Sequence, residues 1–220
     1  SLALERRRIE ALRRAGMARR GIERRDDPHP CRAGLRRCHP FRALHPLVAA
    51  RGGRVVFEAP VELHRLFATS KGVDEIIAFG DRPPDFAWQC PLLSLPLVFE
   101  TTLRNIPDGM PYLGADPELI ADWQRRLAGP ALKVGLVWAG RPEHKRDRHR
   151  SMALAELAPL ASIPNVAFYA LQKGAAVSEA EHAPEGMRLE ILSPLLGDFA
   201  DTAAAIMALD LVISVDTSVA

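Results

Sequence analysis

Apolar and polar positions along this chain follow strand and helix periods in turn from about residue 46 onward. Residues 54–58 and 75–79 are short runs of β-branched and aromatic residues, which are typical of strands. Between them, residues 62–69 place three large apolar side chains on one helical face. A strand, a helix and a strand at this spacing predict a parallel β-α-β unit.

The same alternation begins again after Gly129-Pro130. Asp116 and Pro117 begin a predicted helix that ends at this break. Before it, residues 86–99 are apolar but contain two prolines, which predicts a loop with a short strand. After the break we expect strands over 133–138, 165–171, 187–192 and 211–215, and helices over 154–161 and 199–209. The chain therefore predicts two Rossmann-like α/β domains with parallel sheets, 46–129 and 130–220, the second one truncated.

Composition agrees with globular domains and excludes several classes of protein. The 220 residues are 48% hydrophobic and 25% charged, unlike a disordered or collagen-like chain. No apolar run reaches the roughly 18–20 residues of a membrane span. Three cysteines without zinc-ligand spacing favour neither a disulfide framework nor a structural metal, and indicate a cytoplasmic location. Because the chain begins at Ser1 and ends directly after an apolar strand, we expect a fragment.

Residues 1–45 differ from the rest in charge. They hold 13 arginines, no lysine and five acids, a net charge of +8. Such a segment is typical of an arm that binds nucleic acid or anionic lipid, or of a solvated, poorly ordered tail. Nucleic-acid binding is disfavoured here because lysine is absent and no helical or strand period organises the segment.

Candidate chemistry lies where strands end, because open parallel sheets bind ligands at the carboxyl ends of their strands. The last predicted strand leads into Asp216-Thr217-Ser218, whose hydroxyls and backbone N–H groups could hold a phosphate. These residue types are also the preferred N-caps of helices, and both roles can hold at once.

Two further segments are candidates for contacts with a ligand. The strongly charged loop 141–150 could grip a diphosphate or could be solvated, and Ser151 after it suits a helix cap better than a nucleophile. Gln172-Lys173 follows a strand and could contact a ligand or lie in solvent. His144, Asp147 and His149 lack a fourth metal ligand, so no metal site is expected.

A set of motifs resembles the glycosyltransferase family 9, or heptosyltransferase-like, domain. They are Lys133 to Gly140, His144, Asp147, Arg150-Ser151, Leu171-Gln172-Lys173, Asp198 to Ala203 and Leu211 to Ala220. The chain is most similar to the version at the carboxyl end of bacterial tetratricopeptide-repeat proteins, over roughly residues 46–220.

This resemblance implies a GT-B fold, in which two Rossmann-like domains face a cleft. It implies transfer of a sugar from a nucleotide-sugar donor, which is a substrate, to a glycan or protein acceptor without a metal or other cofactor. Asp216, Thr217 and Ser218 would hold the donor diphosphate, with Gln172, Lys173, Arg150 and Ser151 as further donor contacts.

The catalytic base that the resemblance implies is missing from the sequence. The family's first strand leads into a glycine-rich turn with an aspartate, but Arg37 occupies the corresponding position. If the codons of residues 30–45 are read one nucleotide later, allowed synonymous codons encode a turn of the form A-E-Q-G-F-G-D. We therefore hypothesise that residues 1–45 are an out-of-frame translation, which leaves the first domain without its first strand.

Two functions remain open at this level. One is a glycosyltransferase-like protein whose transfer activity is impaired in this chain. The other is a non-catalytic nucleotide-binding or protein-interaction module attached to a tetratricopeptide-repeat array. The sequence identifies neither the sugar nor the acceptor.

Overall fold

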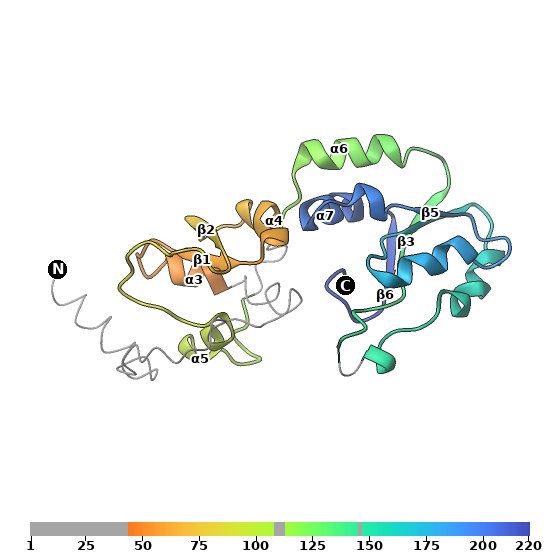
Figure 1. Ribbon diagram of the computed structural model, residues 1–220. Helices are drawn as coiled ribbons and strands as arrows, with labels where there is room; N and C mark the ends of the chain where they lie inside the picture. The colour runs from red at the N-terminus through yellow and green to blue at the C-terminus, as the bar shows by residue number, and fades with distance from the viewer. Residues whose placement is uncertain (1–43, 108–112, 145–146) are drawn as a thin grey trace. The chain divides into compact units, whose positions relative to one another are not determined.

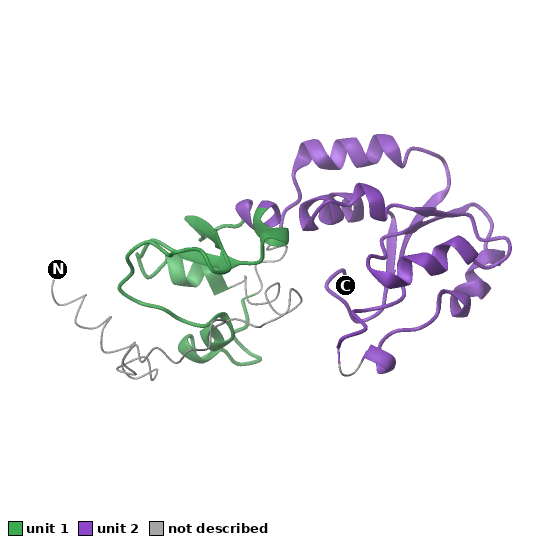
Figure 2. Cartoon of the chain, in the orientation of Figure 1, with its two compact units in different colours: residues 1–64, 70–112 green, residues 65–69, 113–220 purple. Residues whose placement is uncertain are grey.

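The computed structural model describes residues 44–107, 113–144 and 147–220, and it divides into two compact units (Figures 1 and 2). Unit 1 comprises residues 1–64 and 70–112, and unit 2 comprises residues 65–69 and 113–220. Residues 1–43 of the arginine-rich segment, with Arg37, lie outside the described residues. Within the described part of the chain, every helix is too short or too polar to span a lipid bilayer.

The predicted parallel β-α-β unit is present, and its two strands belong to unit 1. Helix α3 (His45–Ala49) precedes strand β1 (Val56–Ala59), which pairs in parallel with β2 (Glu75–Ala78) from Val56↔Glu75 to Ala59↔Ala78. The crossover is a 3-10 turn, η3 (Val61–Leu63), that continues into α4 (His64–Ala68). Leu63, Leu66 and Phe67 are buried, as the helical period predicts.

The short strand expected within residues 86–99 is wrong. This segment forms a 3-10 turn, η4 (Leu92–Ser94), and a short helix, α5 (Leu95–Val98). Pro91 precedes the 3-10 turn and Pro96 lies in the first turn of α5. Proline is tolerated in the first turn because the N–H that it lacks has no partner inside the helix there. The two prolines therefore begin helical turns in this segment.

Unit 2 is built on a four-stranded parallel sheet. Its strands are β3 (Leu132–Val137), β4 (Val166–Ala170), β5 (Leu189–Ile191) and β6 (Leu211–Ser214). The spatial order is β5-β4-β3-β6, so the chain builds outward from β3 on one side and then crosses to the other side of β3. This is the 3-2-1-4 order of a Rossmann-like sheet.

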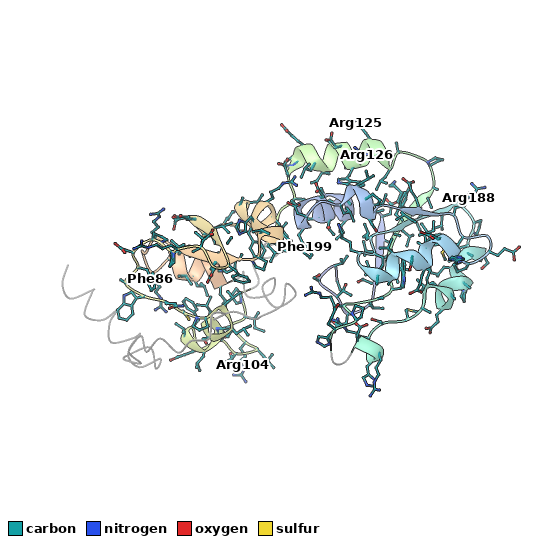
Figure 3. The ribbon with its side chains drawn as sticks, in the orientation of Figure 1. Phe86, Arg104, Arg125, Arg126, Arg188 and Phe199 are labelled. Atoms are coloured by element: carbon teal, nitrogen blue, oxygen red, sulfur yellow. The ribbon has the colours of Figure 1, made fainter. Side chains whose placement is uncertain are left out.

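Both faces of this sheet are covered, which explains why its strands are apolar on both sides. Val137, Tyr169 and Leu171 pack on one face against Trp123 of α6 (Pro117–Arg126) and Ala204 of α7 (Phe199–Met207). Figure 1 shows α6 lying alongside α7, and Figure 3 labels Arg125 and Arg126 on α6 and Phe199 at the start of α7.

The opposite face of the sheet carries 3-10 helices. Val134, Leu136 and Trp138 pack there with Leu154 and Ala180, which belong to η6 (Leu154–Ser162) and η7 (Ala175–His182). The helix predicted over 154–161 therefore exists, in the tighter 3-10 form. Pro159 lies inside it and has no N–H to donate, so a regular α-helical ladder is interrupted. A last 3-10 turn, η8 (Ser193–Leu195), follows β5.

Two aspartates start helices α6 and α7. The Asp116 carboxylate accepts a hydrogen bond from the Glu118 N–H at 2.8 Å, and the Asp198 carboxylate accepts one from the Ala200 N–H at 2.8 Å. Such caps satisfy donors that the first helical turn leaves unpaired. Helix α6 packs on α7 within unit 2, whereas the expected boundary at residue 129 assigns it to the first domain. The two divisions of the chain differ over residues 113–129, which include this helix, and over residues 65–69.

Candidate functional site

The candidate site lies where the order of strands reverses. The chain leaves β3 toward β4, and later returns to the other side of β3 as β6. Neighbouring loops that leave in opposite directions open a crevice at the carboxyl ends of the two strands, which is where open α/β sheets bind ligands. Here these ends are Trp138-Ala139-Gly140 after β3 and Asp216-Thr217-Ser218 after β6, joined by a hydrogen bond from the Val215 N–H to the Val137 carbonyl at 2.9 Å.

The turn of residues 216–218 is held partly by its own side chains. The Ser214 hydroxyl donates to the Val215 carbonyl at 2.8 Å and lies 3.2 Å from the Thr217 hydroxyl. The Val219 N–H donates to the Thr217 hydroxyl oxygen at 3.3 Å. Among residues 44–107, 113–144 and 147–220, the N–H groups of Thr217 and Ser218 and the Ser218 hydroxyl have no hydrogen-bond partner. The turn therefore presents several donors to a ligand.

Arg150 connects this turn to the loop after β3. Its Nη1 donates to the Asp216 carbonyl at 2.9 Å, and its Nε donates to Asp147 Oδ1 at 3.1 Å. The two charged side chains are mostly buried, with exposed fractions of 15% for Arg150 and 17% for Asp147. Figure 1 shows the end of the chain beside the loop that follows β3, as this contact requires.

Gly140 leaves the space that Arg150 and Asp147 occupy. A Cβ atom at Gly140 would lie 2.5 Å from Arg150 Nη2 and 2.6 Å from Asp147 Oδ1, closer than Cβ contacts in proteins. The Gly140 N–H donates to the Ser151 hydroxyl oxygen at 2.8 Å, and the Met152 N–H donates to the Trp138 carbonyl. The loop after β3 is therefore folded back onto the strand end by residues 147–152.

Gln172 has a different role from the ligand contact that was expected. Its side chain is buried, and its Oε1 accepts hydrogen bonds from the N–H groups of Trp138 and Ala139, both at 3.0 Å. Its Nε2 donates to the carbonyls of Ala139 and Lys173 at 3.0 and 2.8 Å. All four hydrogen-bonding positions of the amide are used by backbone atoms. Gln172 therefore holds the strand ends in place and has no polar group left for a ligand.

The remaining predicted residues are divided between the site and its surroundings. The Lys173 ammonium group donates to the Leu196 carbonyl after β5 and so reaches away from the turn at Asp216. Ser151 lies at the site, where its hydroxyl oxygen accepts a hydrogen bond from the Gly140 N–H. Within the described residues, no three His, Cys, Asp or Glu side chains gather into a potential metal site.

Sequence reasoning gave Asp147 and Gly140 no positioning role at the site. Asp147 was considered as part of the charged loop 141–150 and as a metal ligand, and Gly140 as the end of a strand, and both were among the motifs that carry the family resemblance. The spacing of Asp147 and Arg150 is a signal that could have paired them, because oppositely charged residues three apart meet on a helical turn, here η5 (Asp147–His149). No sequence signal links Arg150 to Asp216, which lies 66 residues later.

The chain is similar to Protein FlbA of Caulobacter vibrioides, with 34% identity over 119 residues. These residues are 51% of this chain and 20% of that protein, so the match spans about a fifth of the relative. No family model matches the sequence. No solved structure matches it.

Proposed function

We propose that this chain is a glycosyltransferase-like protein of the GT-B kind, whose unit 2 binds the diphosphate of a nucleotide sugar. The observation that carries the proposal is the turn of residues 216–218 at the carboxyl end of β6. It lies at the reversal of strand order and offers N–H groups of Thr217 and Ser218 that have no partner within the described part of the chain. The motifs that resemble glycosyltransferase family 9 support the choice of a nucleotide sugar, and cysteine usage supports a cytoplasmic location.

The chemistry of the turn suits an anion without a metal. Backbone N–H groups and hydroxyls that converge on one point bind phosphate oxygens through charge-assisted hydrogen bonds. Here the Thr217 and Ser218 N–H groups and the Ser218 hydroxyl would hold the diphosphate. Arg150 adds positive charge beside them while it is bound to the protein. When the sugar leaves the donor, the same groups would stabilise the charge that develops on the leaving diphosphate.

Transfer itself would be slow in this chain. An acceptor hydroxyl would attack the anomeric carbon, the bond from that carbon to the diphosphate would break, and the proton would pass to a base. By the family resemblance, Arg37 occupies the position of that base, and losing a general base costs about 10²–10⁴ in rate. The same residue favours the second candidate function, a non-catalytic nucleotide-binding or protein-interaction module attached to a tetratricopeptide-repeat array. Such a module would bind the donor without transferring it.

Calorimetric titration with nucleoside diphosphates and nucleotide sugars tests the binding step. We expect at least one nucleoside diphosphate to bind, and Ser218→Ala to weaken it by about tenfold, since a hydrogen bond to a charged group contributes about 1.5–3 kcal/mol. Ser162→Ala is the matched control, because its hydroxyl donates to Pro159 in η6. Absence of binding across the panel, or equal loss in both variants, would contradict the proposal.

Turnover of a bound nucleotide sugar separates the two candidate functions. Release of a free nucleoside diphosphate with acceptors supplied would indicate a transferase. Binding of the donor without release would indicate a binding module. If transfer is detected, its slow rate is expected to rise when an aspartate-bearing glycine turn replaces the segment around Arg37.

A further inference from the structure

Arg150 is the residue that a charged diphosphate would most simply be expected to contact, yet its guanidinium group is already engaged. One nitrogen donates to the Asp216 carbonyl at 2.9 Å and another to the Asp147 carboxylate at 3.1 Å. Both charged side chains are more than four-fifths buried. The Asp147 carbonyl also accepts hydrogen bonds from the Arg150 and Ser151 N–H groups. These bonds fix the backbone from which the Arg150 side chain extends.

We propose that Asp147 and Arg150 form a latch that positions the turn of residues 216–218. Arg150 holds the backbone of the turn through the Asp216 carbonyl, and Asp147 orients Arg150. Both are positioning residues, and the N–H groups of Thr217 and Ser218 do the binding. The ligand part of this inference rests on the proposed function, whereas the ordering of the turn does not.

A planar guanidinium group suits this task. It presents several N–H donors in fixed directions, so it can bind a carboxylate and a carbonyl at the same time. A lysine carries the same charge on a single flexible point and cannot reproduce that fork. Gly140 completes the latch, because any side chain there would displace both partners. Its backbone has no positive φ, so an alanine changes the packing without straining the chain.

The latch and a direct phosphate contact predict opposite effects at Asp147. If Arg150 only attracts the anion by its charge, then removal of the neighbouring carboxylate strengthens binding, since a nearby negative charge repels the diphosphate. If the pair positions the turn, then removal of the carboxylate weakens binding, because a smaller fraction of molecules has the turn in the conformation that binds the diphosphate. The sign of the change therefore decides between the two roles.

Four variants of the full chain make the test. Asp147→Ala removes the orienting carboxylate, Arg150→Lys keeps the charge without the fork, and Gly140→Ala displaces the latch without changing any charge. Arg148→Met is the control, because Arg148 is exposed and, among the residues that the structure describes, its Nε donates to the neighbouring His149 and to no part of the turn. Chemical unfolding of each variant confirms that it is folded before it is compared.

The first readout is the backbone order parameter of residues 216–219 by NMR relaxation, measured without ligand. We expect values near the rigid level of about 0.85 in the parent and Arg148→Met, and below about 0.6 in the three latch variants. Unchanged order parameters in Asp147→Ala and Gly140→Ala would overturn the latch. This readout stands even if no nucleotide binds, so failure of the proposed function is distinguishable from failure of the latch.

The second readout is the affinity for uridine, adenosine and guanosine diphosphates. For any diphosphate that binds the parent, we expect the affinity to fall about tenfold in all three latch variants. This corresponds to a fall to about a tenth in the fraction of molecules whose turn has the binding conformation. Arg148→Met is expected to change affinity by less than threefold. Tighter binding by Asp147→Ala, or near-parent binding by Arg150→Lys, would show that Arg150 acts by its charge alone and would overturn the inference.

Discussion

At the residue scale, Gln172 holds two strand ends together by one buried amide. It joins the end of β4 to the end of β3 by hydrogen bonds with residues about 34 positions earlier in the chain. A buried polar group without partners costs free energy, so this amide and the backbone atoms around it depend on each other.

Replacement of Gln172 by leucine should therefore destabilise the protein strongly. The change leaves the buried Trp138 N–H and the half-buried Ala139 N–H without an acceptor, and a buried group of this kind costs about 1–3 kcal/mol. We expect the free energy of unfolding to fall by about 3 kcal/mol in a urea titration. Gln124→Leu on the exposed side of α6 is the control, and should stay within about 0.5 kcal/mol of the parent. Equal stability of the two variants would show that the amide network contributes little.

The position of Gln172 was predictable from the sequence, but its role was not. The pattern placed it directly after a strand, where ligands bind. Whether it faces a ligand or the protein depends on which backbone groups lie opposite, and those belong to a loop far away in the sequence. The same holds for Arg150, whose partner on the turn is 66 residues away.

At the scale of elements, Asp210 ties the start of β6 to the start of β3. Its carboxylate accepts a hydrogen bond from the Lys133 N–H at 2.8 Å and lies 3.3 Å from the Lys133 ammonium group. The backbone hydrogen bond, supported by the lysine charge, lowers the pKa of Asp210 below its ordinary value.

This lower pKa predicts a definite dependence of stability on pH. A carboxyl group whose pKa is lower when folded stabilises the protein above its unfolded pKa of about 3.9, and this stability is lost as pH falls through the folded pKa. We expect Asp210→Asn to unfold at less urea than the parent at pH 7, and the difference to close as pH falls below about 4.

Glu185→Gln provides the control for the loss of one exposed negative charge. The difference between the Asp210→Asn and Glu185→Gln variants should be largest near neutral pH and smallest in acid. A difference that stays constant across the titration would mean that Asp210 does not stabilise the junction through its ionised form.

The periodic elements were well predicted, and the exceptions have local causes. The strands of both sheets and helices α6 and α7 follow alternating or helical periods that packing preserves. The segment 86–99 was read as containing a strand because it is apolar, whereas its prolines begin helical turns. Helix η7 was not predicted at all, because its residues show no clear apolar period and 3-10 turns have a weak sequence signal.

At the scale of the whole molecule, the sequence predicts a parallel α/β architecture, and the structure confirms it in each unit. The 3-2-1-4 order of the second sheet places the ends of β3 and β6 side by side, although they are far apart in the chain. Local sequence patterns do not determine the order of strands in a sheet. The rule that open sheets bind ligands at the carboxyl ends of their strands nevertheless predicted both ends, those of β3 and β6, from the sequence. The assignment of α6 to unit 2 was not predictable from the break at Gly129-Pro130, because a helix that precedes a sheet in sequence can still pack on it.

The most direct test of the central claim is where a nucleoside diphosphate binds on the full chain. Backbone amide signals in an ¹⁵N-labelled sample would be followed during titration with the diphosphate that binds best. We predict that the largest shifts fall on residues 216–218, with smaller ones on residues 138–140 and 150–151 across the strand reversal. Saturable shifts confined to other parts of the chain, or no shifts with any diphosphate, would contradict the assignment of this edge as a nucleotide-sugar site.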